Sequence, residues 1–161
     1  MKTITINVYS FDELTDKAKE KARDEYRNKR YNYSYSGSEE NYDSLKAFCE
    51  YFEVNIKDYS ISPYSYSYVN TDVKNQNFRG LKLNQVNPDY MPTGYSMDYP
   101  LWATFYNVFK ETSNALQAFN DAVDQWIKDV NSDYEYQDSD EYIDEIMTIN
   151  DYEFDENGVI L

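Results

Sequence analysis

Carboxylates are the side chains of this sequence that could carry chemistry, and they gather near its C-terminal end. Within the stretch DSDEYIDE, residues 138–145, Asp140 and Asp144 are four residues apart, as are Glu141 and Glu145. Residues four apart are neighbours on a helix, so each pair of like charges destabilises an isolated helix by about 0.2–0.5 kcal/mol. Carboxylates at this spacing could bind calcium, support glycoside hydrolysis or present negative charge to a basic partner.

The first two of these chemistries fit the sequence poorly. A calcium loop of the EF-hand type needs a glycine for its sharp turn, and residues 138–145 contain none. With 30 acidic residues in the chain, any chosen pair of carboxylates says little about hydrolysis. The chain has no histidine, the commonest general base and transition-metal ligand, and none of its 4 glycines lies in a phosphate-binding loop. We therefore expect no enzymatic activity, no metal site and no cofactor.

The charge of the chain is divided unevenly along its length. The formal net charge is −15 at pH 7. Residues 121–161 hold 14 acidic residues and one base, Lys128, for a net charge of −13. Residues 17–30 hold seven bases and three acids, for a net charge of +4. The sequence predicts an electrically polarised molecule, and it leaves open whether the basic segment contacts the acidic end of the same chain or of another molecule.

An array of carboxylates on rigid helices can imitate the phosphates of nucleic acid. B-DNA carries about one negative charge per 1.7 Å of its axis, and proteins bind it largely through Lys and Arg. We expect that neutralising the four carboxylates of residues 140–145 would weaken partner binding and leave the fold intact. The predicted partner-binding residues are Asp121, Asp124, Asp129, Asp133, Glu135, Asp138, Asp140, Glu141, Asp144 and Glu145.

Tyrosine alternates with serine in YSYSYV, residues 64–69, and nearly so in YNYSYS, residues 31–36. Such alternation is typical of a half-buried strand, which would point Tyr64, Tyr66 and Tyr68 to one helix-covered face of a sheet. A second interpretation makes the same three tyrosines an exposed aromatic platform for a partner, because Tyr supplies contact area at a low entropic cost. Base stacking on nucleic acid also uses such platforms, but it needs a positive groove that this strand does not supply.

The pattern of apolar residues predicts an α+β fold, in which several helices pack on a small antiparallel sheet. The strands are expected to include residues 3–9 and 59–69. The length fits a single domain, residues 1–161, with an acidic helical and hairpin part at residues 121–161. The one cysteine, Cys49, lies in an apolar stretch, so we expect a buried residue in a reducing compartment.

Caps and apolar residues at helical spacing predict the helices. One begins at a capping box that starts at Ser10 or at a second cap, Thr15. A long helix is predicted at residues 101–131, either in one piece or broken near residues 112–114, and a short one starts near Ser139. Near the C-terminal end, an Asn-Gly pair predicts a tight turn. The predicted core centres on Trp102, Phe105, Phe109, Phe119, Val123 and Trp126.

Two stretches of the chain resemble a known group of proteins. The sequence VYSFDELTDKAKEKARDEYR is similar to the opening of a group of small bacteriophage and prophage proteins, with a strand, a Phe-x-Glu-Leu turn and an Ala/Lys-rich helix. The sequence YEYQDSDEYIDEIMTINDYEFDENGVIL resembles the end of the same group, with an acidic helix, an Asn-Asp-x-x-Phe step and a Gly turn. The central ISPYSYSYVNT departs from the group, in which a Gly/Ser/Gln-rich stretch is common.

The resemblance and the acidic charge together lead to an expected function. The resemblance implies a phage or mobile-element origin, and small acidic phage proteins are often anti-defence factors. We expect an inhibitory binding protein of the anti-CRISPR or anti-restriction type, whose acidic surface mimics nucleic acid and occupies a basic channel of a host defence nuclease. The partner would be a basic, nucleic-acid-binding protein in the cytoplasm of the infected bacterium, with no direct binding to nucleic acid or membranes.

An alternative function uses the other features of the sequence. A toxin-neutralising or other phage regulatory protein could bind through the tyrosine-rich strand and the basic helix. Salt separates the two hypotheses, because carboxylates in a basic channel bind less tightly as ionic strength rises, whereas an apolar tyrosine interface does not.

Overall fold

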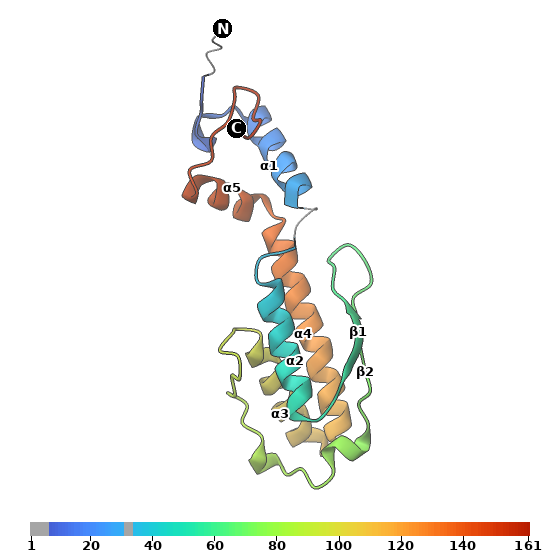
Figure 1. Ribbon diagram of the computed structural model, residues 1–161. Helices are drawn as coiled ribbons and strands as arrows, with labels where there is room; N and C mark the ends of the chain where they lie inside the picture. Colours follow the sequence, from blue (N-terminus) through green and yellow to red (C-terminus); the bar gives the residue numbers. More distant parts are fainter. Residues whose placement is uncertain (1–6, 31–33) are drawn as a thin grey trace. The chain divides into compact units, whose positions relative to one another are not determined.

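The computed structural model describes residues 7–30 and 34–161 (Figure 1). These residues form five α-helices and one antiparallel pair of strands, and three short 3-10 helices lie in the connections. The α+β class predicted from the sequence is confirmed. In chain order the main elements are α1 (Asp16–Arg30), α2 (Ser38–Tyr51), β1 (Ile56–Ser60), β2 (Tyr68–Thr71), α3 (Asp98–Thr112), α4 (Ala115–Gln137) and α5 (Asp140–Ile149).

The chain divides into two compact units. Unit 1 combines Met1–Ser36 with Glu135–Leu161, and unit 2 is the continuous segment Gly37–Tyr134. The expected single domain with an acidic part at residues 121–161 stays a prediction. In the part of the chain that the structure describes, no helix has the length and apolar character needed to cross a membrane.

The core of unit 2 is a cluster of aromatic rings from α2, α3 and α4. The Phe48 ring stacks on Phe119, with centroids 5.2 Å apart, and meets Trp102 edge to face at 5.1 Å. Offset and edge-to-face pairs of this kind add stability beyond the burial of apolar area. Of the predicted core residues, Phe109 is half-buried and the others are buried: Trp102, Phe105, Phe119, Val123 and Trp126. Cys49 is buried as expected, and burial raises the pKa of its thiol to about 12.

The long helix predicted at residues 101–131 is broken, as one of the two alternatives had it. Helix α3 ends at Thr112, and Ser113 takes a left-handed conformation with φ of 57°. Asn114 then caps α4, because its Oδ1 accepts a hydrogen bond from the N–H of Gln117 at 3.1 Å. Figure 1 shows α2 and α4 running side by side.

The sheet of unit 2 is a two-stranded hairpin. Strand β1 pairs with β2 in antiparallel register, from Ile56 opposite Thr71 to Ser60 opposite Tyr68. Of the expected strand at residues 3–9, only residues 7–9 belong to the described part of the chain, and they do not pair with this hairpin. Residues 3–6 lie outside the described residues, and Tyr9 instead makes an isolated antiparallel bridge with Phe154 in unit 1.

The expectation that Tyr64, Tyr66 and Tyr68 line one helix-covered face of a strand is wrong. Residues 61–67 form the loop between β1 and β2, and the side chains of Tyr64 and Tyr66 are 75% and 84% exposed. The physical reason is that serines in this segment bond to the nearby backbone and so replace the ladder of a strand. The hydroxyl of Ser62 accepts the N–H of Tyr64 at 3.2 Å, for example.

Hydrogen bonds to Asp72 close the open end of the hairpin. Its two carboxylate oxygens accept the backbone N–H of Asn55 at 2.7 Å and the side-chain amide of Asn55 at 2.9 Å. Lys57 Nζ lies 3.4 Å from the same carboxylate. The bonds from the Asn55 side chain and backbone, assisted by Lys57, lower the pKa of Asp72 to about 2.

This arrangement predicts how Asp72 contributes to stability as pH changes. A carboxyl with a depressed pKa stabilises the fold above its unfolded value and loses that contribution as pH falls through its folded value. Asp72→Asn should therefore lower the urea midpoint most at neutral pH, and its deficit should shrink as pH falls from about 4 towards 2. Asp43→Asn is a control that removes one exposed charge and none of these bonds. A deficit that does not vary with pH would contradict the prediction.

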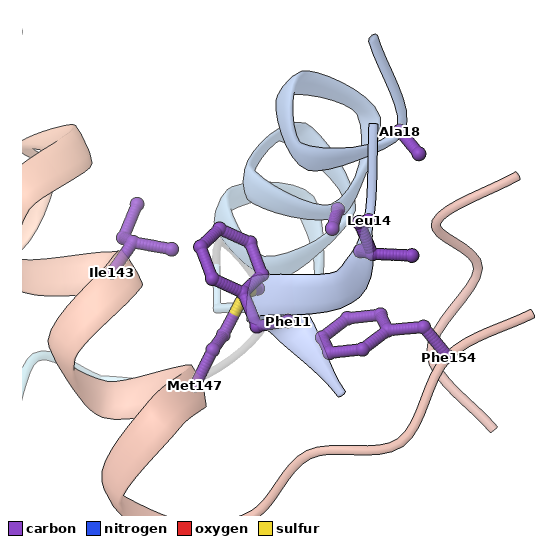
Figure 2. Close-up of a cluster of buried hydrophobic side chains, with 7 residues drawn as sticks. Phe11, Leu14, Ala18, Ile143, Met147 and Phe154 are labelled. Atoms are coloured by element: carbon purple, nitrogen blue, oxygen red, sulfur yellow. The ribbon is translucent and has the colours of Figure 1, made fainter. Parts of the chain in front are cut away.

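The core of unit 1 lies between α1, α5 and the C-terminal segment (Figure 2). The centroids of the Phe11 and Phe154 rings lie 5.9 Å apart. The small side chains of Ala18 and Ala22 are buried and let α1 approach the rest of this core closely. Residues that share this cluster are Phe11, Leu14, Ala18, Ala22, Ile143, Met147 and Phe154. Backbone hydrogen bonds of 2.9 Å in both directions join Tyr9 to Phe154.

The caps predicted for unit 1 are present. Ser10 donates its backbone N–H and its hydroxyl to Glu13, at 2.9 and 3.0 Å, in a short 3-10 helix that precedes α1. Thr15 Oγ1 accepts the N–H of Ala18 at 3.3 Å and caps α1 itself. Ser139 caps α5 by accepting the N–H of Tyr142 at 3.2 Å.

The predicted Asn157-Gly158 turn is confirmed. The N–H of Gly158 donates to the carbonyl of Asp155 at 3.0 Å, and Gly158 has a φ of 78°. A Cβ atom at this position would collide with the backbone carbonyl of Ala18. The turn therefore needs glycine both for its conformation and for its contact with α1.

Two glycine substitutions separate these requirements. Gly94 also has a positive φ, of 74°, but a Cβ atom there would meet nothing within 4 Å. Gly94→Ala should destabilise the protein by about 1–2 kcal/mol through the left-handed backbone alone. Gly158→Ala should lower the free energy of unfolding by about 1–3 kcal/mol more than Gly94→Ala does, because the added carbon also displaces α1. Urea denaturation of both variants checks this, and equal losses would mean that the contact between Gly158 and Ala18 has little effect.

Candidate partner-binding surface

The arginines of α1 face carboxylates on α5 and on the turn before it. Arg23 donates from Nε and Nη2 to the two oxygens of Asp144, each at 2.6 Å. Arg27 pairs with Asp140. All of these residues belong to unit 1, so the basic segment 17–30 contacts the acidic end of its own chain.

A third ion pair, between Arg30 and Asp138, extends this row. It is the most buried of the three, since the two side chains are only 13% and 14% exposed. Arg30 also donates from Nη1 to the backbone carbonyl of Gln137 at 2.5 Å. The hydroxyl of Tyr35 donates to Asp138 at 2.7 Å, and Arg30 lies 5.1 Å from the centre of the Tyr35 ring.

The spacing of the sequence explains why the pairs form together. Arg23, Arg27 and Arg30 follow one another at intervals of four and three residues, which places them on one face of α1. On α5, Asp140 and Asp144 share a face in the same way. Because a guanidinium fits a carboxylate in a two-point fork, arginine suits this array better than lysine would. The hydrogen bond to Asp144 raises the pKa of Arg23 above its ordinary value.

The two units of the folded protein carry similar net charges. Unit 1 contains 16 acidic and 8 basic residues, a net charge of −8, and unit 2 contains 14 and 7, a net charge of −7. The two units therefore do not differ in net charge as the two segments of the sequence do. The contrast along the sequence disappears because the fold places the most basic segment and most of the acidic end in one unit.

Helix α5 carries a second row of carboxylates that serves no such purpose. Glu141 and Glu145 are exposed, and within the described residues neither makes an ion pair. Loss of hydration and the charges of these two residues raise the pKa of Tyr136. The rings of Tyr136 and Tyr142 meet edge to face at 5.5 Å. Glu141 and Glu145 therefore lie near Tyr136 at the end of α4, whose ring meets that of Tyr142 on α5.

The remaining predicted acidic residues lie on α4. Asp124 and Glu135 are exposed, whereas Asp121, Asp129 and Asp133 are half-exposed. Asp129 accepts a hydrogen bond from Gln125 Nε2 at 2.8 Å. From Asp121 to Asp133 the helix rises by about 18 Å, at about 1.5 Å per residue. Unit 2 thus carries four carboxylates spread along one long helix, and Glu135 belongs to unit 1.

The secondary candidates, Tyr64, Tyr66 and Tyr68, lie at the tip of the hairpin in unit 2. The rings of Tyr66 and Tyr68 stack with centroids 6.1 Å apart and planes inclined by 23°. The hydroxyl of Tyr68 donates to Asp58 on β1 at 2.8 Å. The exposed platform, the second of the two interpretations, describes Tyr64 and Tyr66 better than a buried sheet face does.

A metal centre would be another candidate site among the described residues. In residues 7–30 and 34–161, no group of three or more Cys, Asp or Glu side chains is arranged to hold a metal ion. No protein-family model, curated protein or solved structure matches the chain. The resemblance to small phage proteins stays a prediction, and function has to be argued from the carboxylates and tyrosines themselves.

The two carboxylate rows of α5 predict opposite effects on stability. Asp140→Asn with Asp144→Asn removes the ion pairs that join Arg23 and Arg27 to α5, which should destabilise the protein by about 1–3 kcal/mol. Glu141→Gln with Glu145→Gln removes one repulsive pair, so stability should stay the same or rise by up to about 0.5 kcal/mol. Urea denaturation of the two double variants tests this. Equal effects would show that Asp140 and Asp144 do not hold α1 and α5 together.

Proposed function

We propose that this protein is an inhibitory binding protein of the anti-CRISPR or anti-restriction type. Exposed carboxylates on α4 and α5 take the place of nucleic-acid phosphates and occupy a basic channel of a bacterial defence nuclease. The partner is a basic, nucleic-acid-binding protein in the cytoplasm of the bacterial host, and the protein itself performs no catalysis.

The observation that carries this proposal is that two carboxylates of α5 form ion pairs within the chain, whereas the two carboxylates next to them are exposed. Asp140 and Asp144 lie against arginines and hold α1 in place. One residue further along, Glu141 and Glu145 turn outward, are exposed and make no ion pair among the described residues. Their i,i+4 repulsion opposes helix formation, and no ion pair among the described residues offsets it. Charge that the fold does not use is available for recognition.

The structure also changes which residues form the proposed surface. The charges of Asp138, Asp140 and Asp144 are matched by arginines of the same chain, so we leave them out of the interface. The proposed binding residues form two separate sets: Asp121, Asp124, Asp129 and Asp133 in unit 2, and Glu135, Glu141 and Glu145 in unit 1. With net charges of −8 and −7, each unit presents a negative field that attracts a basic partner and accelerates its encounter.

The alternative function keeps the exposed lysines of α1, among them Lys17 and Lys21, but not its arginines. A toxin-neutralising protein that binds through the basic helix would need the cationic side chains of α1. Arg23, Arg27 and Arg30 are each engaged by carboxylates of the same chain. The tyrosines of the hairpin loop are compatible with either function, so they do not favour the alternative.

Phage plating tests the proposed function. The protein is expressed in bacteria that carry a restriction enzyme or an RNA-guided nuclease, and these cells are challenged with a phage that the system attacks. Plating efficiency should rise by about a hundredfold or more with the wild-type protein, which corresponds to relief of most of the restriction. Glu141→Gln with Glu145→Gln should lose most of this effect, although the variant remains folded. Cells without a defence system are the control, and their plating should not change.

A purified nuclease gives the matching measurement in solution. Inhibition of DNA binding should weaken steeply between about 50 and 200 mM salt, because the contacts replace those of phosphates. The proposal would be overturned if the wild-type protein protected phage from neither class of system. It would also be overturned if the glutamine variant protected as well as the wild type.

A further inference from the structure

The loop at residues 61–67, which we name the Tyr–Ser loop, is the most exposed aromatic feature of unit 2. Tyr66 is 84% exposed and Tyr64 is 75% exposed, whereas apolar rings of this size are normally buried. Both residues lie in the loop that joins β1 to β2. Figure 1 shows these two strands and their loop as the long hairpin beside α4. Exposed rings gathered at one tip are typical of recognition surfaces.

The serines of the loop hold its backbone in place. The backbone N–H of Ser62 donates to Ser67 Oγ at 3.0 Å, and the hydroxyl of Ser67 bonds to the carbonyl of Ser62 at 3.0 Å. The side-chain amide of Asn131 on α4 donates to the same Ser67 hydroxyl at 3.0 Å. Ser62 and Ser67 therefore order the loop, whereas Tyr64 and Tyr66 are exposed to solvent. Such preordering lowers the entropy lost when a partner binds.

A carboxylate stands beside the aromatic rings. Asp58 on β1 is exposed and accepts the hydroxyl of Tyr68 at 2.8 Å, and the ring of Tyr68 stacks on that of Tyr66. Two tyrosine rings and a negatively charged hydrogen-bond acceptor thus lie together at this end of the hairpin. The only base in residues 56–71 is Lys57, which is paired with Asp72 at the other end of the hairpin.

We infer that the Tyr–Ser loop recognises arginine side chains on the surface of a partner protein. A guanidinium can stack on the face of a tyrosine ring and can also donate to a neighbouring carboxylate, which the compact ammonium of lysine does less well. Single-stranded nucleic acid would also stack on tyrosines but needs a positively charged groove. Unit 2 has a net charge of −7 instead. The inference rests on the proposed function for the identity of its partner, since nucleic-acid channels are rich in arginine.

Two model peptides test the loop without knowledge of the natural partner. The probes are deca-arginine and deca-lysine, which carry equal charge, and binding to the full-length protein is measured by calorimetry at about 150 mM salt. The wild type should bind deca-arginine about two- to fivefold more tightly than deca-lysine, as expected for exposed cation–π contacts. Tyr66→Leu should abolish this preference and leave deca-lysine binding unchanged. Tyr66→Phe, which keeps the ring, should retain it.

A second exposed tyrosine provides the control. Tyr99 on α3 is 57% exposed and lies outside the Tyr–Ser loop, so Tyr99→Leu should keep the full preference for arginine. Melting temperatures of all three variants should equal that of the wild type, because neither ring is buried. The inference would be overturned if the wild type did not distinguish the two peptides. It would also be overturned if Tyr66→Leu kept the preference, or if a poly-dT oligonucleotide bound and required Tyr66.

The outcomes of this test and of the phage test are independent. A wild-type protein that protects phage but does not prefer deca-arginine would overturn the role of the Tyr–Ser loop alone. A protein that prefers deca-arginine through Tyr66 but protects no phage would overturn the proposed function and leave arginine recognition in place.

Discussion

The two-point ion pair between Arg23 and Asp144 is the interaction on which unit 1 depends. It joins residues 121 positions apart in the sequence, and it lies beside a small apolar cluster that includes Phe11 and Met147. The only fully buried side chains that α1 contributes to this cluster are the alanines Ala18 and Ala22, and the half-buried Tyr26 packs against it. The arginine row therefore has two effects. It adds charge-assisted hydrogen bonds at the edge of the cluster, and it offsets the mutual repulsion of the three arginines, which lie on one face of α1.

The same pairing determines what negative charge remains for a partner. A helix turns by about 100° per residue, so neighbouring residues of α5 face different surroundings. Asp144 meets a guanidinium, whereas Glu145 meets solvent. A run of acids that looks uniform in the sequence thus contains two sets of side chains. One set forms ion pairs within the fold, and the other set is exposed on the surface. The proposed function concerns only the second.

Much of the fold could be predicted from local patterns, and the failures have a common cause. The caps at Thr15 and Ser139, the break before Asn114 and the turn at Gly158 each depend on residues a few positions away, which a sequence displays directly. The alternation of tyrosine and serine was misleading because period two is shared by strands and by loops whose serines bond to their own backbone.

The site was harder to predict because its pairs are distant in sequence. The matching intervals of Arg23 with Arg27 and of Asp140 with Asp144 were visible and could have suggested the pairing. Unit 2 is a continuous insertion between the two segments of unit 1, and this has a consequence for the order of folding during synthesis. On the ribosome, Gly37–Tyr134 can fold as soon as it emerges. The arginines of α1, made earlier, must wait for Asp138, Asp140 and Asp144, so the first helix synthesised is among the last to be secured.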